Sequence, residues 1–161
     1  MRVLDLACGA GRHAIAAAEL GARVTAIDVD AERLRRASRV AQHRRLSIDW
    51  VEADLGHHVV PDRGFDLVMI FNYLDRRRMP DFAGAVGPGG YLMVETFLES
   101  QRRLGWGPTS EDHLLRPGEL PMLFAPLEMI VVREALDFFD GRPMAVASGL
   151  AQRTGNDAGR A

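Results

Sequence analysis

The sequence has no lysine, since all twenty of its basic residues are arginines, and this excludes Schiff-base catalysis and a P-loop lysine. It has one cysteine, Cys8, too few for a disulfide framework or a cysteine-rich zinc site, and we predict no metal centre. No stretch approaches the roughly twenty apolar residues of a membrane span. The amino terminus also lacks a basic-then-apolar signal, so we expect a cytoplasmic protein without a membrane partner.

The net charge of −2 gives no general attraction to nucleic acid, and charge excludes no further class of protein. The helix predicted after Asp30 carries four arginines, and we interpret them as a solvated face rather than a nucleic-acid patch. With 161 residues, 47% of them hydrophobic, the chain can bury a full core. We predict a single domain over residues 1–152 and a frayed tail over 153–161.

The stretch from Val3 to Ala14 is predicted to form a buried strand, a glycine turn and the start of a helix. Gly9 and Gly11 permit positive φ, so the backbone can approach a ligand and its N–H groups can bond it. Asp5 adds a carboxylate at the strand end, which suits a cationic ligand group better than a pyrophosphate. This stretch therefore predicts a ligand site.

The elements that follow alternate between strands and helices, which predicts a parallel α/β sheet with right-handed crossovers. Expected strands cover residues 2–6, 23–28, a segment around 48–52, 65–71, 91–97, 128–134 and 144–152, and expected helices cover about 11–20, a segment from 30, 76–86 and 117–124. Asp140-Gly141 joins the last two strands as a hairpin that breaks the parallel pattern. Residues 56–64 and 98–116 are expected to be irregular.

Further polar residues stand at the carboxyl ends of the predicted strands, where open α/β sheets bind ligands. Asp28 lies seventeen residues beyond Gly11, the place where an acidic side chain meets ribose hydroxyls in nucleotide-binding folds. Asp54 ends the third strand, and Asn72 and Tyr73 end the fourth. Together with Asp5, Asp28 and Asp54 place three carboxylates at strand ends, and each suits a hydrogen-bond donor or a positive charge of a ligand.

These motifs together resemble the class I S-adenosylmethionine-dependent methyltransferases, over about residues 2–152. The resemblance is carried by Asp5-Leu-Ala-Cys-Gly9-Ala-Gly11, by Asp28 and Asp54, by Phe65-Asp-Leu-Val, by Gly87-Pro-Gly-Gly, and by the closing hairpin. Segments beginning at Asn72, Pro88 and His113 look like the branch that includes tellurite-resistance methyltransferases. The resemblance implies a Rossmann-like seven-stranded sheet in the order 3-2-1-4-5-7-6, with strand 7 antiparallel and helices on both faces.

The resemblance also implies roles for matching residues toward S-adenosylmethionine. The turn with Ala7, Gly9 and Gly11 would hold the methionine portion, with Asp5 near the ammonium. Asp28, with Val29 beside it, would meet the ribose, while Asp54 and Leu55 would meet the adenine. Asn72 and Tyr73 would face the transferable methyl. Independently of the resemblance, the place of His113 in the long irregular segment 98–116 makes it the candidate general base, and a loop histidine without a catalytic role is the alternative. The expected substrate is a small-molecule methyl acceptor, and the sequence does not reveal the oligomeric state.

Several alternatives stay open at this point. Family members normally carry helices before the first strand, and here that strand begins at residue 2, so we expect a shortened front without cap helices. A non-catalytic S-adenosylmethionine binder is therefore one rival, and a dinucleotide-binding oxidoreductase domain is another. Arg12 and His13 could touch the cofactor, Arg76 to Arg78 could attract an anionic acceptor, and Cys8 could be an activated nucleophile, although each has a purely structural interpretation.

Overall fold

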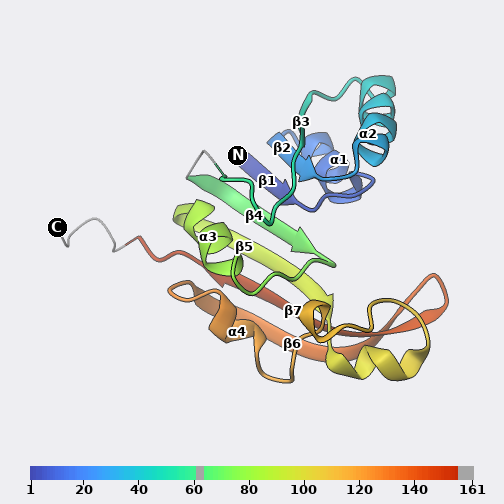
Figure 1. Ribbon diagram of the computed structural model, residues 1–161. Helices are drawn as coiled ribbons and strands as arrows, with labels where there is room; N and C mark the ends of the chain where they lie inside the picture. The colour runs from blue at the N-terminus through green and yellow to red at the C-terminus, as the bar shows by residue number, and fades with distance from the viewer. Residues whose placement is uncertain (61–63, 156–161) are drawn as a thin grey trace.

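The computed structural model describes residues 1–60 and 64–155, and its centre is a seven-stranded sheet (Figure 1). The strand order is β3-β2-β1-β4-β5-β7-β6, as predicted. All neighbours pair in parallel except β7, which is antiparallel to both β5 and β6. The strands are β1 (Arg2–Leu6), β2 (Arg23–Asp28), β3 (Ile48–Glu52), β4 (Phe65–Phe71), β5 (Val86–Phe97), β6 (Glu128–Phe139) and β7 (Arg142–Gln152).

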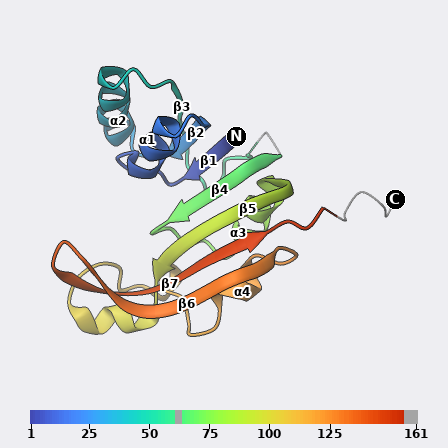
Figure 2. The ribbon, with the colours of Figure 1, turned by 180° about the vertical axis from the view of Figure 1, so that it is seen from behind.

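Helices cover the two faces of this sheet with two separate cores. Helices α1 (Arg12–Glu19) and α2 (Ala31–His43) pack on the β1–β3 half, and Figure 2 shows α3 (Met79–Ala85) and α4 (Leu120–Leu123) behind β5, β7 and β6. The larger core lies on the α3 side and includes Leu4, Phe82 and Leu92, whereas Val3 and Ala14 belong to the α1 side. Alternate residues of one strand therefore face different cores, as the two-residue period of a strand requires.

The start of α2 follows the prediction, because the Asp30 carboxylate accepts hydrogen bonds from the backbone N–H groups of Glu32 and Arg33. Leu34, Ala37 and Ala41 form its buried stripe. Val40, beside this stripe, is 43% exposed. The outward position of Arg33 next to the cap places its side chain near the end of β2.

Two predicted helices are shorter than expected. The helix expected over 76–86 begins only at Met79, with Pro80 in its first turn, because the Asp75 carboxylate accepts from the N–H of Arg77 and holds a turn there. The helix expected over 117–124 is a single turn over Leu120–Leu123. The N–H of Arg116 donates to the Glu119 carboxylate, so this stretch forms a turn before the helix.

The predicted strands of the second half are longer in the structure. β5 begins at Val86, five residues before the prediction, because Val86 pairs with Phe65 across a register shift. The hairpin strands reach to Asp140-Gly141, where both residues have positive φ and close a two-residue turn. The expected irregular segment 98–116 contains two short 3-10 helices, Glu99–Leu104 and Glu111–His113.

Parts of two predictions lie outside the described residues, namely positions 61–63 of the loop and 156–161 of the tail. The single domain over 1–152 stays a prediction. In the part of the chain that the structure describes, no helix is long and apolar enough to cross a bilayer.

Candidate active site

The turn between β1 and α1 depends on backbone conformations that favour glycine. Ala7, Gly9 and Gly11 have φ values of 56°, 54° and 73°. A Cβ at Gly11 would approach the Trp50 ring to 2.5 Å, whereas a Cβ at Gly9 would have only an Arg33 nitrogen at 3.9 Å. Both the contact with Trp50 and the positive φ therefore favour glycine at position 11. At position 9 only the positive φ favours glycine.

Hydrogen bonds within the protein already use the amides of this turn. The N–H of Cys8 donates to the Ile27 carbonyl at 3.0 Å, and that of Gly11 donates to the Cys8 carbonyl at 2.9 Å. The N–H of Gly9 donates to Asp28 Oδ2 at 2.7 Å. Protein acceptors therefore occupy the N–H groups of Gly9 and Gly11 in this structure, and ligand binding by these N–H groups stays a prediction.

Asp28 ends β2 and faces the turn, with only 8% of its surface exposed. Its Oδ2 accepts from Gly9, and its Oδ1 accepts from the N–H of Asp30 at 2.9 Å. A carboxylate oxygen can accept two hydrogen bonds, so each oxygen keeps capacity for one ligand hydroxyl. Asp28 is thus fixed in orientation and still able to bind two donors.

Asp5 lies beneath the turn and is 1% exposed. Among the described residues, no hydrogen-bond partner reaches its Oδ2. Burial raises the pKa of Asp5 to about 7, a backbone hydrogen bond at Ala14 opposes this, and the charge of Asp28 adds to it. A cationic group bound above the turn would favour the ionised form.

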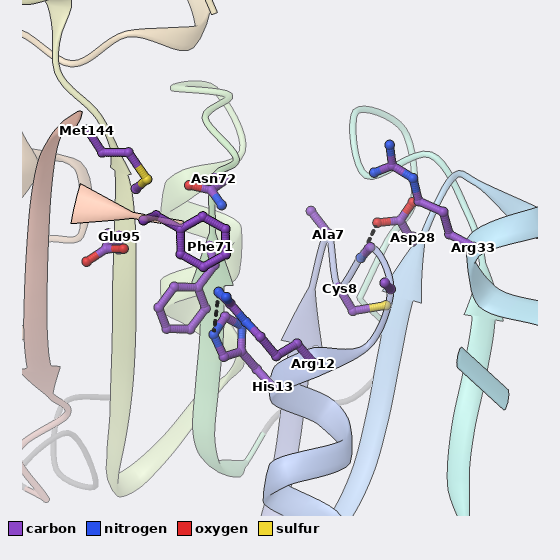
Figure 3. Close-up of a pocket in the computed structure, with 13 residues that line it drawn as sticks. Ala7, Cys8, Arg12, His13, Asp28, Arg33, Phe71, Asn72, Glu95 and Met144 are labelled. Carbon is purple, nitrogen blue, oxygen red and sulfur yellow. Dashed lines mark hydrogen bonds between the residues drawn. The ribbon is translucent and has the colours of Figure 1, made fainter. Parts of the chain in front are cut away.

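A cavity of about 480 Å³ opens beside the turn, and two walls face each other across it (Figure 3). We name the first the turn wall, formed by Ala7, Cys8, Gly9, Ala10, Asp28 and Arg33. We name the second the strand wall, formed by Phe71, Asn72, Glu95, Phe139 and Met144. Arg12 and His13 of α1 also line the cavity. The turn wall holds the predicted residues Ala7, Gly9 and Asp28, and the strand wall holds the predicted Asn72.

The remainder of the strand wall is not predicted by any sequence motif. Phe71 and Glu95 are partners in the pairing of β4 with β5, while Phe139 and Met144 come from the hairpin. The His13 ring stacks on Phe71 with 3.8 Å between ring centroids, and Arg12 lies 5.2 Å from the Phe139 ring. These contacts explain His13 and Arg12 without a ligand and also place both in the cavity.

A second cavity of about 750 Å³ lies at the same edge of the sheet and contains three predicted residues, Asp54, Tyr73 and His113. Asp54 accepts from the N–H of Gly56, and its Oδ2 lies 3.0 Å from Nδ1 of His57. Asn72 lines the first cavity and its neighbour Tyr73 lines the second. The chain at the carboxyl end of β4 therefore borders both cavities.

The segment that carries His113 is fastened by Arg76. The Arg76 guanidinium donates to the carbonyls of Glu111 at 3.0 Å and Leu114 at 2.8 Å, and it forms an ion pair with Glu119 at 2.6 Å. These bonds hold the 3-10 turn Glu111–His113 against the end of β4.

The neighbours of Arg76 are paired as well. Arg77 forms an ion pair with Asp75, and Arg78 forms one with Asp81. Each of the three arginines thus has an acidic partner, and these ion pairs support the structural interpretation of the cluster.

Leu55 and Val29 lie outside the lining of both cavities, whereas Cys8 belongs to the turn wall. Leu55 is 4% exposed and belongs to the larger core, and Val29 is 67% exposed beside Asp28. Burial raises the pKa of the Cys8 thiol, and the charges of Asp5 and Asp28 add to this. Cys8 is therefore a neutral thiol and not an activated nucleophile.

Comparison with known proteins gives consistent matches. A family model described as a methyltransferase domain matches residues 3–90. An uncharacterized methyltransferase of Mycobacterium tuberculosis is 37% identical over 114 residues, which are 67% of this chain and 57% of that protein. The ubiquinone biosynthesis O-methyltransferase of Methylocella silvestris is 31% identical over 159 residues, covering 87% of this chain and 62% of that protein. The chain thus spans less than two thirds of the length of these curated relatives.

Solved structures match nearly the whole chain. TehB from Haemophilus influenzae superposes with a TM-score of 0.80 at 20% identity, over 95% of this chain and 57% of that one. An S-adenosylmethionine-dependent methyltransferase from Mesorhizobium loti superposes with a TM-score of 0.76 at 21% identity, over 94% of this chain and 90% of that one. At these identities the structural matches describe the fold.

Proposed function

Because the chain belongs to the class I S-adenosylmethionine-dependent methyltransferases, we propose that it transfers the methyl group of that cofactor to a small-molecule acceptor by in-line displacement. Membership of this family removes the dinucleotide-binding alternative. The observation that carries the proposal is Asp28, a buried carboxylate that faces the cavity with one unused acceptor position on each oxygen.

The residues around Asp28 fit the parts of the cofactor. Asp28 would accept from both ribose hydroxyls, with Val29 beside it. The turn formed by Ala7, Gly9 and Gly11 would hold the methionine portion, and the orphaned oxygen of Asp5 beneath it supplies a negative charge for the ammonium.

The adenine end is assigned to the second cavity. Asp54 lines that cavity and would accept from the adenine amino group. Leu55 would pack near the ring from the core side. Arg12 lines the first cavity and lies in the first turn of α1, so its guanidinium suits the carboxylate of the methionine portion.

The bound cofactor supplies a sulfonium methyl that is already activated, so the protein has to align the acceptor and exclude water. Asn72 adopts φ 57°, an uncommon conformation for a non-glycine residue, and its N–H donates to the Glu95 carbonyl at 2.8 Å. This fixes the chain where Asn72 and Tyr73 would face the methyl. His113, held by Arg76, would accept a proton from the acceptor.

Calorimetry tests the binding half of this proposal. We expect S-adenosylmethionine and S-adenosylhomocysteine to bind to the wild-type protein and NADH to give no heat. Failure of both sulfur ligands to bind would contradict the proposal.

A screen of methyl acceptors, read as formation of S-adenosylhomocysteine, tests the catalytic half. Binding without transfer to any acceptor would favour the second candidate function, a non-catalytic S-adenosylmethionine binder.

A further inference from the structure

Glu95 is the only carboxylate of the strand wall, and the roles proposed so far leave its side chain unused. It is half-buried near the carboxyl end of β5, and Figure 3 shows it on the side of the cavity that faces Ala7 and Asp28. Within the described part of the chain, no hydrogen bond or ion pair involves its carboxylate. A half-buried charge without a partner is costly, and a bound ligand can supply the missing partner.

The charged groups near Glu95 are engaged elsewhere. Arg133 of β6 donates to Asp137 Oδ2 at 2.7 Å. Arg12 of α1 donates to Nε2 of His13 at 3.2 Å and lies over the Phe139 ring. Burial raises the pKa of Glu95, the charge of Asp137 adds to this, and Arg133 and Arg12 oppose it. The Glu95 carboxylate is thus partly desolvated and forms no direct bond with either of these arginines.

The remainder of the strand wall is mainly apolar. Phe71, Phe139 and Met144 line the cavity near Glu95, so the wall can accept an apolar body together with one positive group. An oxyanion would meet repulsion from Glu95 and from nearby Asp137. Arg76 and Arg77, the arginines that line the second cavity, form ion pairs with Glu119 and Asp75.

We propose that the strand wall binds the methyl acceptor and that Glu95 selects a small apolar amine by pairing with its ammonium group. The inference rests on the proposed function, since it assigns the turn wall to the cofactor and the strand wall to the acceptor. Glu95 acts here in substrate selection only: the ammonium that it binds has no lone pair, so another nucleophilic atom of the acceptor takes the methyl. His113 lines the other cavity, and this inference does not use it.

The test uses three ligands of matched size: benzylamine, which is cationic at pH 7, neutral benzyl alcohol and anionic benzoate. Each is titrated calorimetrically into the wild-type protein loaded with S-adenosylhomocysteine. We expect benzylamine to bind roughly tenfold more tightly than benzyl alcohol, as a charge-assisted hydrogen bond predicts. Benzoate is expected to bind more weakly than either.

Glu95→Gln keeps the shape of the side chain and should remove the preference for benzylamine. The matched control is Glu128→Gln, an exposed glutamate on β6 away from the cavity, which should keep the preference. Equal affinities for benzylamine and benzyl alcohol in the wild type, or a preference that survives in Glu95→Gln, would overturn the assignment of Glu95 while S-adenosylhomocysteine still binds. Absence of S-adenosylhomocysteine binding in the wild type would overturn both proposals.

Discussion

The two walls of the first cavity differ in how many of their polar groups have hydrogen-bond partners within the protein. In the turn wall, Gly9 and Asp28 bond each other, and Asp28 is further fixed by Asp30. In the strand wall, the Glu95 carboxylate has no partner among the described residues, and Phe71, Phe139 and Met144 surround it with apolar surface. The turn wall is therefore rigid before any ligand arrives, whereas the strand wall leaves a charge for the ligand to satisfy.

This difference suits two kinds of ligand. An obligatory cofactor is the same in every cycle, so a rigid wall built by backbone and buried acids recognises it with little loss of entropy. An acceptor is selected by a few side chains that project from strand ends, and these can vary without disturbing the turn. Substitutions in one wall should therefore leave the other wall's ligand largely unaffected.

The most severe break of the turn wall is expected from Gly11→Ala. The new Cβ would meet the Trp50 ring at 2.5 Å while the residue keeps φ 73°, so overpacking adds to backbone strain. We expect a loss of about 3–5 kcal/mol in the free energy of unfolding together with loss of S-adenosylhomocysteine binding.

Gly21→Ala is the matched control for this substitution. Gly21 has φ 84°, and a Cβ there would have nothing within 4 Å, so only about 1–2 kcal/mol of strain is expected. Urea denaturation of both variants checks the prediction. Equal losses would show that the contact with Trp50 contributes nothing.

The second prediction concerns the charge beneath the turn wall. The pKa of Asp5 is about 7 in the folded protein against an ordinary 3.8, so the folded state holds the proton more tightly than the unfolded state. Without ligand, stability should therefore fall as pH rises from about 4 to about 7. Asp5→Asn removes this penalty and should be more stable than wild type by up to about 4 kcal/mol at pH 8, with the difference vanishing near pH 4.

Thermal unfolding at several pH values measures this difference, with exposed Asp49→Asn on β3 as the control. The same Asp5→Asn variant should bind S-adenosylhomocysteine more weakly, because the charge that faces the ammonium is gone. A stability difference that does not change with pH would contradict the raised pKa of Asp5.

The third and smallest effect concerns the second cavity and leaves both walls intact. His113→Ala should lower turnover roughly hundredfold, the contribution of a general base, with little change in cofactor affinity. His43→Ala, at the end of α2, is the control and should turn over like wild type. Steady-state kinetics with an accepted substrate measures the turnover of both variants. Unchanged turnover in His113→Ala would contradict the proposed role of His113.

The contrast between the two walls also explains which cavity residues can be predicted from the sequence. The turn wall lies within short motifs, so Gly9 and Asp28 were predicted from residue type and spacing. Ala7 and the strand order were predicted only from the family resemblance that those motifs carry. The strand wall is assembled from four strands that meet only through the sheet topology, and no local spacing predicts that Glu95 and Met144 share a cavity. The use of the Gly9 N–H by Asp28 was also beyond prediction, because it depends on a contact between β1 and β2.

The division of labour between the walls is tested most directly by titrating S-adenosylhomocysteine into Asp28→Ala and Glu95→Gln. Asp28→Ala removes the ribose acceptors and the anchor of Gly9, so we predict a loss of affinity of roughly hundredfold. Glu95→Gln changes only the opposite wall, so its affinity should stay within about twofold of wild type. Equal weakening by the two substitutions, or no effect of Asp28→Ala, would contradict the account.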